Sequence, residues 1–129
     1  MREILFRGKR VENGEWVYGA YYGLCRMTNK AGDFGYAHLM RQSNNEPLYR
    51  VDSETIGQYT GLTDKNGKKI FEGDILKVYE TQEHAQNVSV SYENGQFVVS
   101  HYALKLLSDR TLQSEVIGTI HDNPELLED

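Results

Sequence analysis

The sequence predicts a mainly β protein with an N-terminal β hairpin region, a small C-terminal barrel and one or two short helical turns. Three observations favour this fold class. Turn-forming pairs recur at short intervals, strong β formers lie between them, and the chain has twelve glycines against two prolines. At 129 residues the chain is long enough for a small barrel plus a subdomain. We expect residues 1–55 to form the N-terminal region and residues 56–129 the barrel, packed as one compact unit.

Two segments show the alternation expected of β hairpins. In "ILFRGKRVENGEWVYGAYYG", residues 4–23, Asn13-Gly14 can adopt the positive φ angles of a type I′ turn. In "SVSYENGQFVVS", residues 89–100, alternating apolar residues precede Asn94-Gly95 and others return after it. The second segment is the clearer hairpin.

Three other segments depart from this alternation. "HYALKLLSDRT", residues 101–111, favours a single helical turn, because Leu104 and Leu107 are three residues apart. "DNPELLED" at the end has a cap at Asp122 or Asn123 and proline at the first helical position, with Leu126 and Leu127 expected to pack on the barrel. Residues 26–50 are polar and contain glycines, so we expect a long loop or an irregular β excursion there.

The stretch "YTGLTDKNGKKIFEGDILKVY", residues 59–79, brings three carboxylates close together in sequence. A calcium loop counted from Asp64 would place lysines at positions five and six and isoleucine at position twelve, where oxygen ligands and glycine are needed. A phosphate loop would need Ser or Thr after Gly67-Lys68 and a helix behind it. We therefore interpret the stretch as two tight turns, in which Asp64 hydrogen-bonds backbone two residues on and Glu72 to Asp74 form the second corner. Both sides of the strand near Ile75 and Leu76 should be buried.

The same residues carry a family resemblance. "REILFRG" at 2–8, "IGQYTGLTDKNGKKIFEGDIL" at 56–76 and "EVIGTIHDNPELL" at 115–127 resemble the signature blocks of the YopX family, small proteins encoded by bacteriophages and prophages. The resemblance implies an SH3-like C-terminal barrel and a phage protein that acts in the host cytoplasm. It implies no known activity and supplies no catalytic residues. Gly8 departs from the family pattern.

Composition excludes some classes of protein and leaves others open. The single cysteine, Cys25, forms no internal disulfide and suits the cytoplasm, and no apolar run is long enough for a membrane helix. The four histidines lack metal-site spacing, so we expect no metal, no cofactor and no catalytic residue. A nucleophilic pair of Cys25 with His38 or His121 stays open. So does a divalent ion held jointly by Asp64, Glu72 and Asp74.

Aromatic residues and charge indicate where a partner could bind. The chain has nine tyrosines, which suit interfaces and base stacking, although a barrel core could also account for them. Residues 1–50 carry a net charge of +3 and residues 51–129 one of −8. The N-terminal region is thus both basic and rich in aromatic rings. Its candidate interaction residues are Arg2, Arg7, Lys9, Arg10, Trp16, Tyr18 and Tyr22.

Three functions follow in order of preference. The first is a non-enzymatic accessory protein that binds a protein partner or its own copies, as a homo-oligomer. The second is a single-stranded nucleic-acid-binding factor that uses the basic, tyrosine-rich N-terminal region. Net acidity, −5 over the chain, disfavours it relative to the first. The third is an enzyme of unrecognised type.

Overall fold

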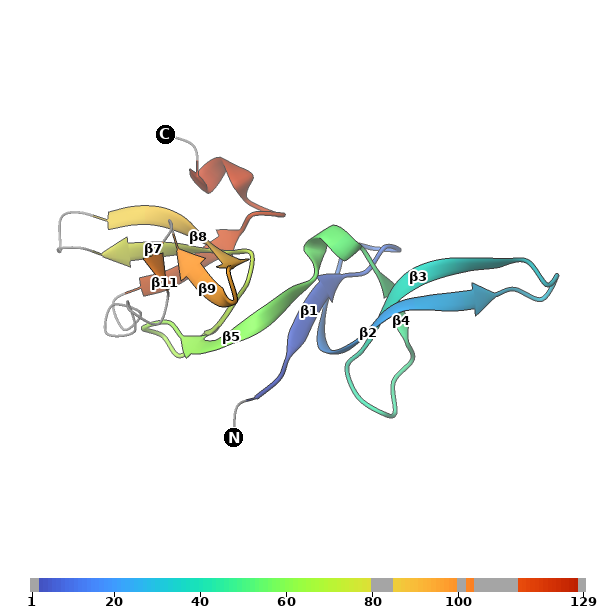
Figure 1. The fold of residues 1–129 in the computed structure, drawn as a ribbon. Coiled ribbons are helices and arrows are strands. Elements are labelled where there is room, and N and C mark those ends of the chain that lie inside the picture. Colours follow the sequence, from blue (N-terminus) through green and yellow to red (C-terminus); the bar gives the residue numbers. More distant parts are fainter. Residues whose placement is uncertain (1–2, 80–84, 100–101, 104–113, 128–129) are drawn as a thin grey trace. The chain divides into compact units, whose positions relative to one another are not determined.

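The computed structural model describes residues 3–79, 85–99, 102–103 and 114–127, most of them in antiparallel strands (Figure 1). The predicted mainly β fold class is confirmed. By internal contacts the chain divides into two compact units. The N-terminal unit is Ile4–Gln58, and the C-terminal unit is Tyr59–Asp129 together with Met1–Glu3.

The N-terminal unit is an antiparallel sheet with strand order β4-β3-β2-β1, to which the first residues of β5 add beside β1. Its elements are β1 (Phe6–Lys9), β2 (Trp16–Thr28), β3 (Phe34–Arg41), β4 (Tyr49–Val51), the 3₁₀ turn η1 (Ser53–Thr55) and the start of β5 (Gly57–Thr63). Asp52 caps η1, because its side chain accepts a hydrogen bond from the Glu54 N–H.

The core of this unit is small and contains Val17, Met40 and Val51, all at most 3% exposed. Two glycines allow strands to approach closely around it. A Cβ at Gly8 would lie 2.9 Å from the Met40 Sδ, and a Cβ at Gly19 would overlap the backbone oxygen of Arg41. Glycine is therefore needed at these positions for packing rather than for a turn.

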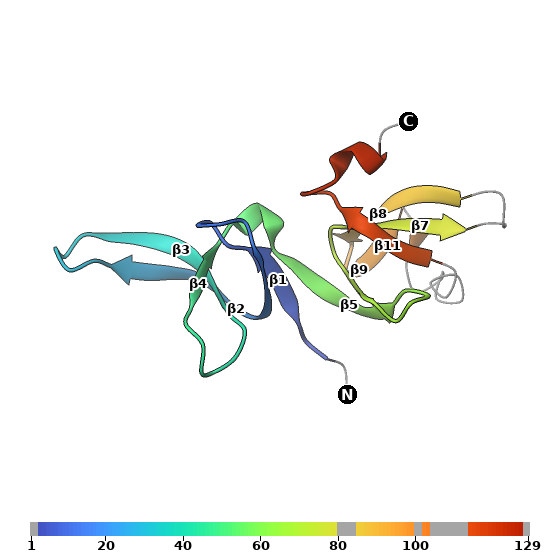
Figure 2. The same ribbon diagram turned by 180° about the vertical axis from the view of Figure 1, so that it is seen from behind.

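Of the two alternatives expected for residues 26–50, the first half forms a β excursion and not a long loop, although its two strands are regularly paired. β2 continues to Thr28 and β3 begins at Phe34, and Figures 1 and 2 show the two strands extending together as a ribbon beyond β1 and β4. The turn between them closes through the Asn29 side chain, which accepts hydrogen bonds from the N–H groups of Ala31 and Asp33. The stretch before β4 is a loop, as expected.

The first turn of the sheet also differs from the prediction. Of Asn13 and Gly14, only Gly14 has a positive φ, so the pair does not form a type I′ turn. Instead the Arg10 N–H donates to the Glu15 oxygen, and the Gly14 N–H donates to the Arg10 oxygen. The loop is longer than two residues, and β1 and β2 pair only as far as Lys9 and Trp16.

The C-terminal unit contains a five-stranded antiparallel sheet with order β10-β9-β8-β7-β11, and β6 pairs with the rest of β5. Its elements are β6 (Lys69–Phe71), β7 (Asp74–Tyr79), β8 (Ala85–Glu93), β9 (Gln96–Val99), β10 (Tyr102–Ala103), β11 (Ser114–Thr119) and the 3₁₀ turn η3 (Pro124–Leu127). The strand order is consistent with the expected SH3-like barrel. Its core residues are Ile70, Leu76, Val88, Val90 and Val99.

Local predictions in this unit are largely confirmed. Asn94 and Gly95 have φ values of 52° and 82° and close the β8–β9 hairpin, as a type I′ turn requires. Ile75 and Leu76 are both at most 1% exposed, so β7 is buried on both sides there. The C-terminal helical turn forms as η3. The turn expected over residues 101–111 lies outside the described residues apart from Tyr102 and Ala103, which form β10.

Candidate functional site

The acidic stretch around Asp64 serves the fold. Asp64 is 3% exposed, and its Oδ1 accepts hydrogen bonds from the backbone N–H groups of Asn66 and Lys68 at 2.8 and 2.9 Å. Its Oδ2 accepts one from the Val116 N–H at 2.9 Å. Burial alone would raise the pKa of Asp64, but these backbone hydrogen bonds and the Lys68 charge together lower it. The carboxylate therefore stays ionised to hold the turn.

The other candidate reaction centres are also accounted for by structural contacts. Asp74 is 1% exposed and its Oδ2 accepts a hydrogen bond from the Phe71 N–H at 2.7 Å. No group of three His, Cys, Asp or Glu among the described residues is placed to hold a metal ion. The Cys25 thiol donates to backbone oxygens of its own strand, and His38 Nδ1 lies 2.5 Å from the Tyr21 hydroxyl.

The N-terminal sheet brings five of the seven candidate residues onto one face, four of them through the pairing of β1 with β2 and the fifth, Tyr22, further along β2. β1 and β2 pair Arg7 with Tyr18 and Lys9 with Trp16, and residues directly opposite in an antiparallel pair share a face. The Arg7 guanidinium lies 4.6 Å from the centre of the Trp16 ring, and the Lys9 ammonium lies 5.4 Å from it. These are cation–π distances.

The same face continues across β3 and β4 with residues that sequence reasoning missed. Arg41 is opposite Ala20, and its guanidinium lies 5.7 Å from the ring of Tyr22. Arg50 is opposite Leu39, so it points to the side of Arg41. We call this surface the aromatic–basic face; its members are Arg7, Lys9, Trp16, Tyr18, Tyr22, Arg41 and Arg50.

Exposure separates the members that a partner can reach from those that support them. Tyr18 and Tyr22 are 43% and 49% exposed, whereas Arg7 is only 4% exposed beside Trp16. The two tyrosine rings and Arg50 are thus the accessible part of the face. Arg7 stiffens it from within.

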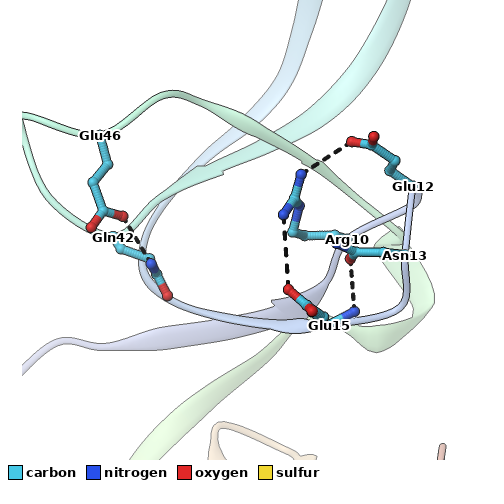
Figure 3. A network of polar contacts seen from close by, with 6 residues as sticks. All are labelled: Arg10, Glu12, Asn13, Glu15, Gln42 and Glu46. Carbon is cyan, nitrogen blue, oxygen red and sulfur yellow. Dashed lines mark hydrogen bonds and ion pairs between the residues drawn. The ribbon is translucent and has the colours of Figure 1, made fainter.

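Two candidate residues do not join this face. Arg2 lies outside the described residues. Arg10 follows the last residue of β1 and is bound locally: its Nη2 is 3.1 Å from Glu12 and its Nη1 is 3.9 Å from Glu15 (Figure 3). Its guanidinium also lies 4.2 Å from the ring centre of Tyr49. Arg10 therefore stabilises the β1–β2 loop, while in the β3–β4 loop the Gln42 side-chain amide donates a hydrogen bond to the Glu46 carboxylate at 2.8 Å (Figure 3).

The charged residues in strands β1 to β4 are all basic. β1 to β4 contain five basic residues and no Asp or Glu; the acidic residues of the unit lie in its loops and in η1. Within the part of the chain that the structure describes, Arg26, Arg41 and Arg50 form no ion pair with a carboxylate. The sequence already shows that these segments lack Asp and Glu. Only the pairing of the strands shows which of their basic residues share one face.

No helix among the described residues is long and apolar enough to cross a membrane.

Comparison with known proteins agrees with the fold. The family described as YopX protein matches residues 5–128. The crystal structure of protein EF1440 from Enterococcus faecalis is similar at 26% identity and a TM-score of 0.59, covering 99% of this chain and 100% of that one. The crystal structure of YopX from Bacillus subtilis, at 22% identity and a TM-score of 0.51, covers 100% and 98% and shows the same fold. No curated protein matches the chain. Because the family match spans nearly all of its length, the chain belongs to the YopX protein family.

Proposed function

We propose that this chain is a phage or prophage accessory protein without catalytic activity, which acts in the cytoplasm of the bacterial host by binding protein through the aromatic–basic face. The observation that carries the proposal is the pair of half-exposed rings, Tyr18 and Tyr22, on the same face as Arg41 and Arg50, which form no ion pair with a described carboxylate. Phage origin and the cytoplasm come from the resemblance of the family blocks and from the single cysteine.

Physical reasons favour a protein partner for such a surface. Tyrosine and arginine are enriched in protein interfaces, because each offers a large apolar body with a polar end. An arginine without a partner carboxylate gains a charge-assisted hydrogen bond when a partner supplies one. The strands also provide a rigid platform, so little ordering is needed on binding.

A second candidate is single-stranded nucleic acid. The observation that favours it is the absence of any carboxylate from strands β1 to β4, since aromatic rings on a basic groove are how sequence-tolerant single-strand binders work. The net charge of −5 makes it the weaker candidate.

Affinity capture tests the protein-binding proposal. The tagged full-length chain is expressed in a bacterial strain that carries the corresponding phage or prophage, and captured proteins are quantified for the wild type, Tyr18→Ser/Tyr22→Ser and Tyr92→Ser. Tyr92 is the matched control, because it is 53% exposed but lies on β8. We expect a protein partner to be retained by the wild type and by the control but lost from the double variant. Equal capture by all three would refute a role for this face.

A salt titration tests the nucleic-acid candidate. Binding of a fluorescent single-stranded DNA oligonucleotide is followed by anisotropy at low and physiological salt. Each phosphate contact lowers the affinity as salt rises, with a logarithmic slope of about −0.7 per contact for single strands. Absence of binding at low salt, or binding that does not weaken with salt, removes this candidate and leaves the protein proposal intact.

A further inference from the structure

The ribbon formed by the ends of β2 and β3 has one apolar face without a cover. The strands pair Leu24 with His38, Arg26 with Tyr36 and Thr28 with Phe34, so these six side chains lie on the same side. We call residues 24–38 the hairpin arm. Figures 1 and 2 both show it as two strands with no further strand of its unit beside them.

Exposure along this face is unusually high for large apolar residues. Leu24, Phe34 and Tyr36 are 61%, 57% and 62% exposed. The same face of β3 is fully buried at Met40, two residues beyond His38. An apolar surface that continues from a core onto open strands is a typical contact site for another protein.

The arm is already ordered for contact. The Phe34 and Tyr36 rings meet edge to face with centres 6.2 Å apart, and the Arg26 guanidinium lies 4.1 Å from the Phe34 ring centre. Arg26 is exposed and has no ion pair with any described carboxylate. The face therefore offers aromatic rings together with one accessible positive charge.

The C-terminal segment offers the opposite combination. Ile120 and Leu127 are 38% and 40% exposed, and Asp122 and Glu125 between them are exposed as well. The sequence contains no Lys or Arg after Arg110. The segment is therefore apolar and acidic, where the hairpin arm is apolar and basic.

We propose that the hairpin arm of one copy docks onto the segment 120–127 of a second copy. Leu24, Phe34 and Tyr36 cover Ile120 and Leu127, and Arg26 pairs with the carboxylate of Glu125. This goes beyond the proposed function, because the partner is a second copy and the contact is made by the hairpin arm and not by the aromatic–basic face. Two arms packed face to face would instead bring the Arg26 side chains together with no carboxylate between them.

The contact joins different surfaces on the two copies. Such a heterologous contact closes into a ring or continues as an open chain, according to the rotation between neighbours. Association should therefore depend on protein concentration and weaken as salt rises, because one exposed charge pair takes part.

Charge reversal provides the test. Light scattering and sedimentation velocity are run on the wild type, Arg26→Glu, Glu125→Arg, an equimolar mixture of these two, and the double variant. We expect each single variant to associate at least about tenfold more weakly than the wild type. The mixture and the double variant should regain association, because the reversed charges again meet opposite ones. Glu93→Arg is the matched control for Glu125→Arg, since it reverses an exposed carboxylate on β8 that belongs to neither surface, and it should associate as the wild type does.

Removal of the apolar contact gives an independent measurement. Phe34→Ser/Tyr36→Ser should be monomeric with an unchanged circular dichroism spectrum, because both side chains are exposed. Three results would overturn the inference. The first is a wild type that stays monomeric at every concentration, and the second is charge variants that do not restore association when mixed. The third is association that strengthens with salt and is unaffected by Glu125→Arg. The last result would indicate arm-to-arm packing. A monomeric wild type that still captures another protein through Tyr18 and Tyr22 would leave the proposed function standing.

Discussion

The Asp64 carboxylate accepts a hydrogen bond from the Val116 N–H at 2.9 Å, across 52 residues of sequence. The same carboxylate closes the turn between β5 and β6 through Asn66 and Lys68. One buried side chain thus links a local turn to β11, and Lys65 reinforces the link because its N–H donates to the Ser114 oxygen at 2.9 Å. The stability of the C-terminal unit should depend strongly on it.

Asp64→Ala should be among the more damaging single changes in this unit. It leaves three backbone N–H groups without their acceptor, and each buried unsatisfied donor costs about 1–3 kcal/mol. We expect the free energy of unfolding, measured by urea denaturation, to fall by about 3 kcal/mol or more. Glu93→Ala, at an exposed position of β8, should change it little. Equal effects of the two variants would contradict the structural role of Asp64.

The contribution of Asp64 should depend on pH in a defined direction. Its pKa in the folded chain is lowered from the ordinary value of 3.8. The ionised carboxylate therefore stabilises the fold fully above pH 3.8 and loses this effect as pH falls through the lower folded pKa. The difference in unfolding free energy between wild type and Asp64→Asn should be constant near neutral pH and shrink in acid. A difference that grows on acidification would have the wrong sign.

Gly19 and Gly35 form a matched pair on the N-terminal sheet. A Cβ at Gly19 would overlap the Arg41 backbone, whereas a Cβ at Gly35 meets nothing within 4 Å. We expect Gly19→Ala to destabilise the unit by about 2 kcal/mol or more, since overpacking typically costs about 1–3 kcal/mol and backbone cannot move aside easily. Gly35→Ala should be neutral or slightly stabilising. Thermal unfolding of both variants decides the matter, and similar melting temperatures would show that β2 and β3 are not this close.

The hydroxyl of Tyr21 should contribute measurably to the base of the hairpin arm. It lies 2.5 Å from His38 Nδ1, and the two rings stack with centres 5.9 Å apart. Tyr21→Phe removes the hydrogen bond and keeps the ring, so we expect a loss of about 0.5–1.5 kcal/mol in unfolding free energy. Tyr36→Phe provides the control, because Tyr36 is exposed and its hydroxyl has no hydrogen-bond partner among the described residues. The unfolding free energies of the two variants are measured in dilute solution. An equal loss in both would show that the effect does not come from the hydrogen bond to His38.

On the aromatic–basic face, substitution of the exposed tyrosines should abolish binding with little loss of stability. Tyr18→Ala and Tyr22→Ala remove half-exposed rings, so each should change the unfolding free energy by about 1 kcal/mol or less while abolishing capture of the partner. Trp16→Ala should lower stability more, because the ring packs on both Arg7 and Lys9. Urea denaturation beside the capture experiment distinguishes the two effects. Loss of capture only in unfolded variants would argue against a binding role for the tyrosines.

What could be predicted from the sequence was the chemistry that acts over a few residues. The turn at Asp64 and the hairpin at Asn94-Gly95 follow from side chains that bond their own backbone or accept positive φ. Asn13-Gly14 is the same residue pair as Asn94-Gly95, but it does not form a type I′ turn. There Arg10 and Glu15 pair through their backbones and Arg10 is held by Glu12, so the tertiary contacts of the loop override the local turn preference.

The hairpin arm and the arginines of the aromatic–basic face could not be read from local patterns. Residues 24–28 and 34–38 form strands because β2 and β3 pair with each other, although several of their apolar residues are exposed to solvent. Arg41 comes beside Tyr22, and Arg50 comes onto the same face as Arg41, only through a sheet register set across three strands. Residues this far apart in sequence can be recognised as neighbours only when the register of the strands is known.

Gly23, with a φ of 81°, lies in an irregularity where β2 uses two residues, Tyr22 and Gly23, against Leu39 alone on β3. If Tyr22 and Gly23 instead continued the regular pairing, Cys25 and Met27 would come opposite Tyr36 and Phe34. The irregularity therefore decides which side of the protruding ribbon carries Leu24 and Arg26. Deletion of Gly23 would remove the irregularity and still leave Leu24 opposite His38 and Arg26 opposite Tyr36.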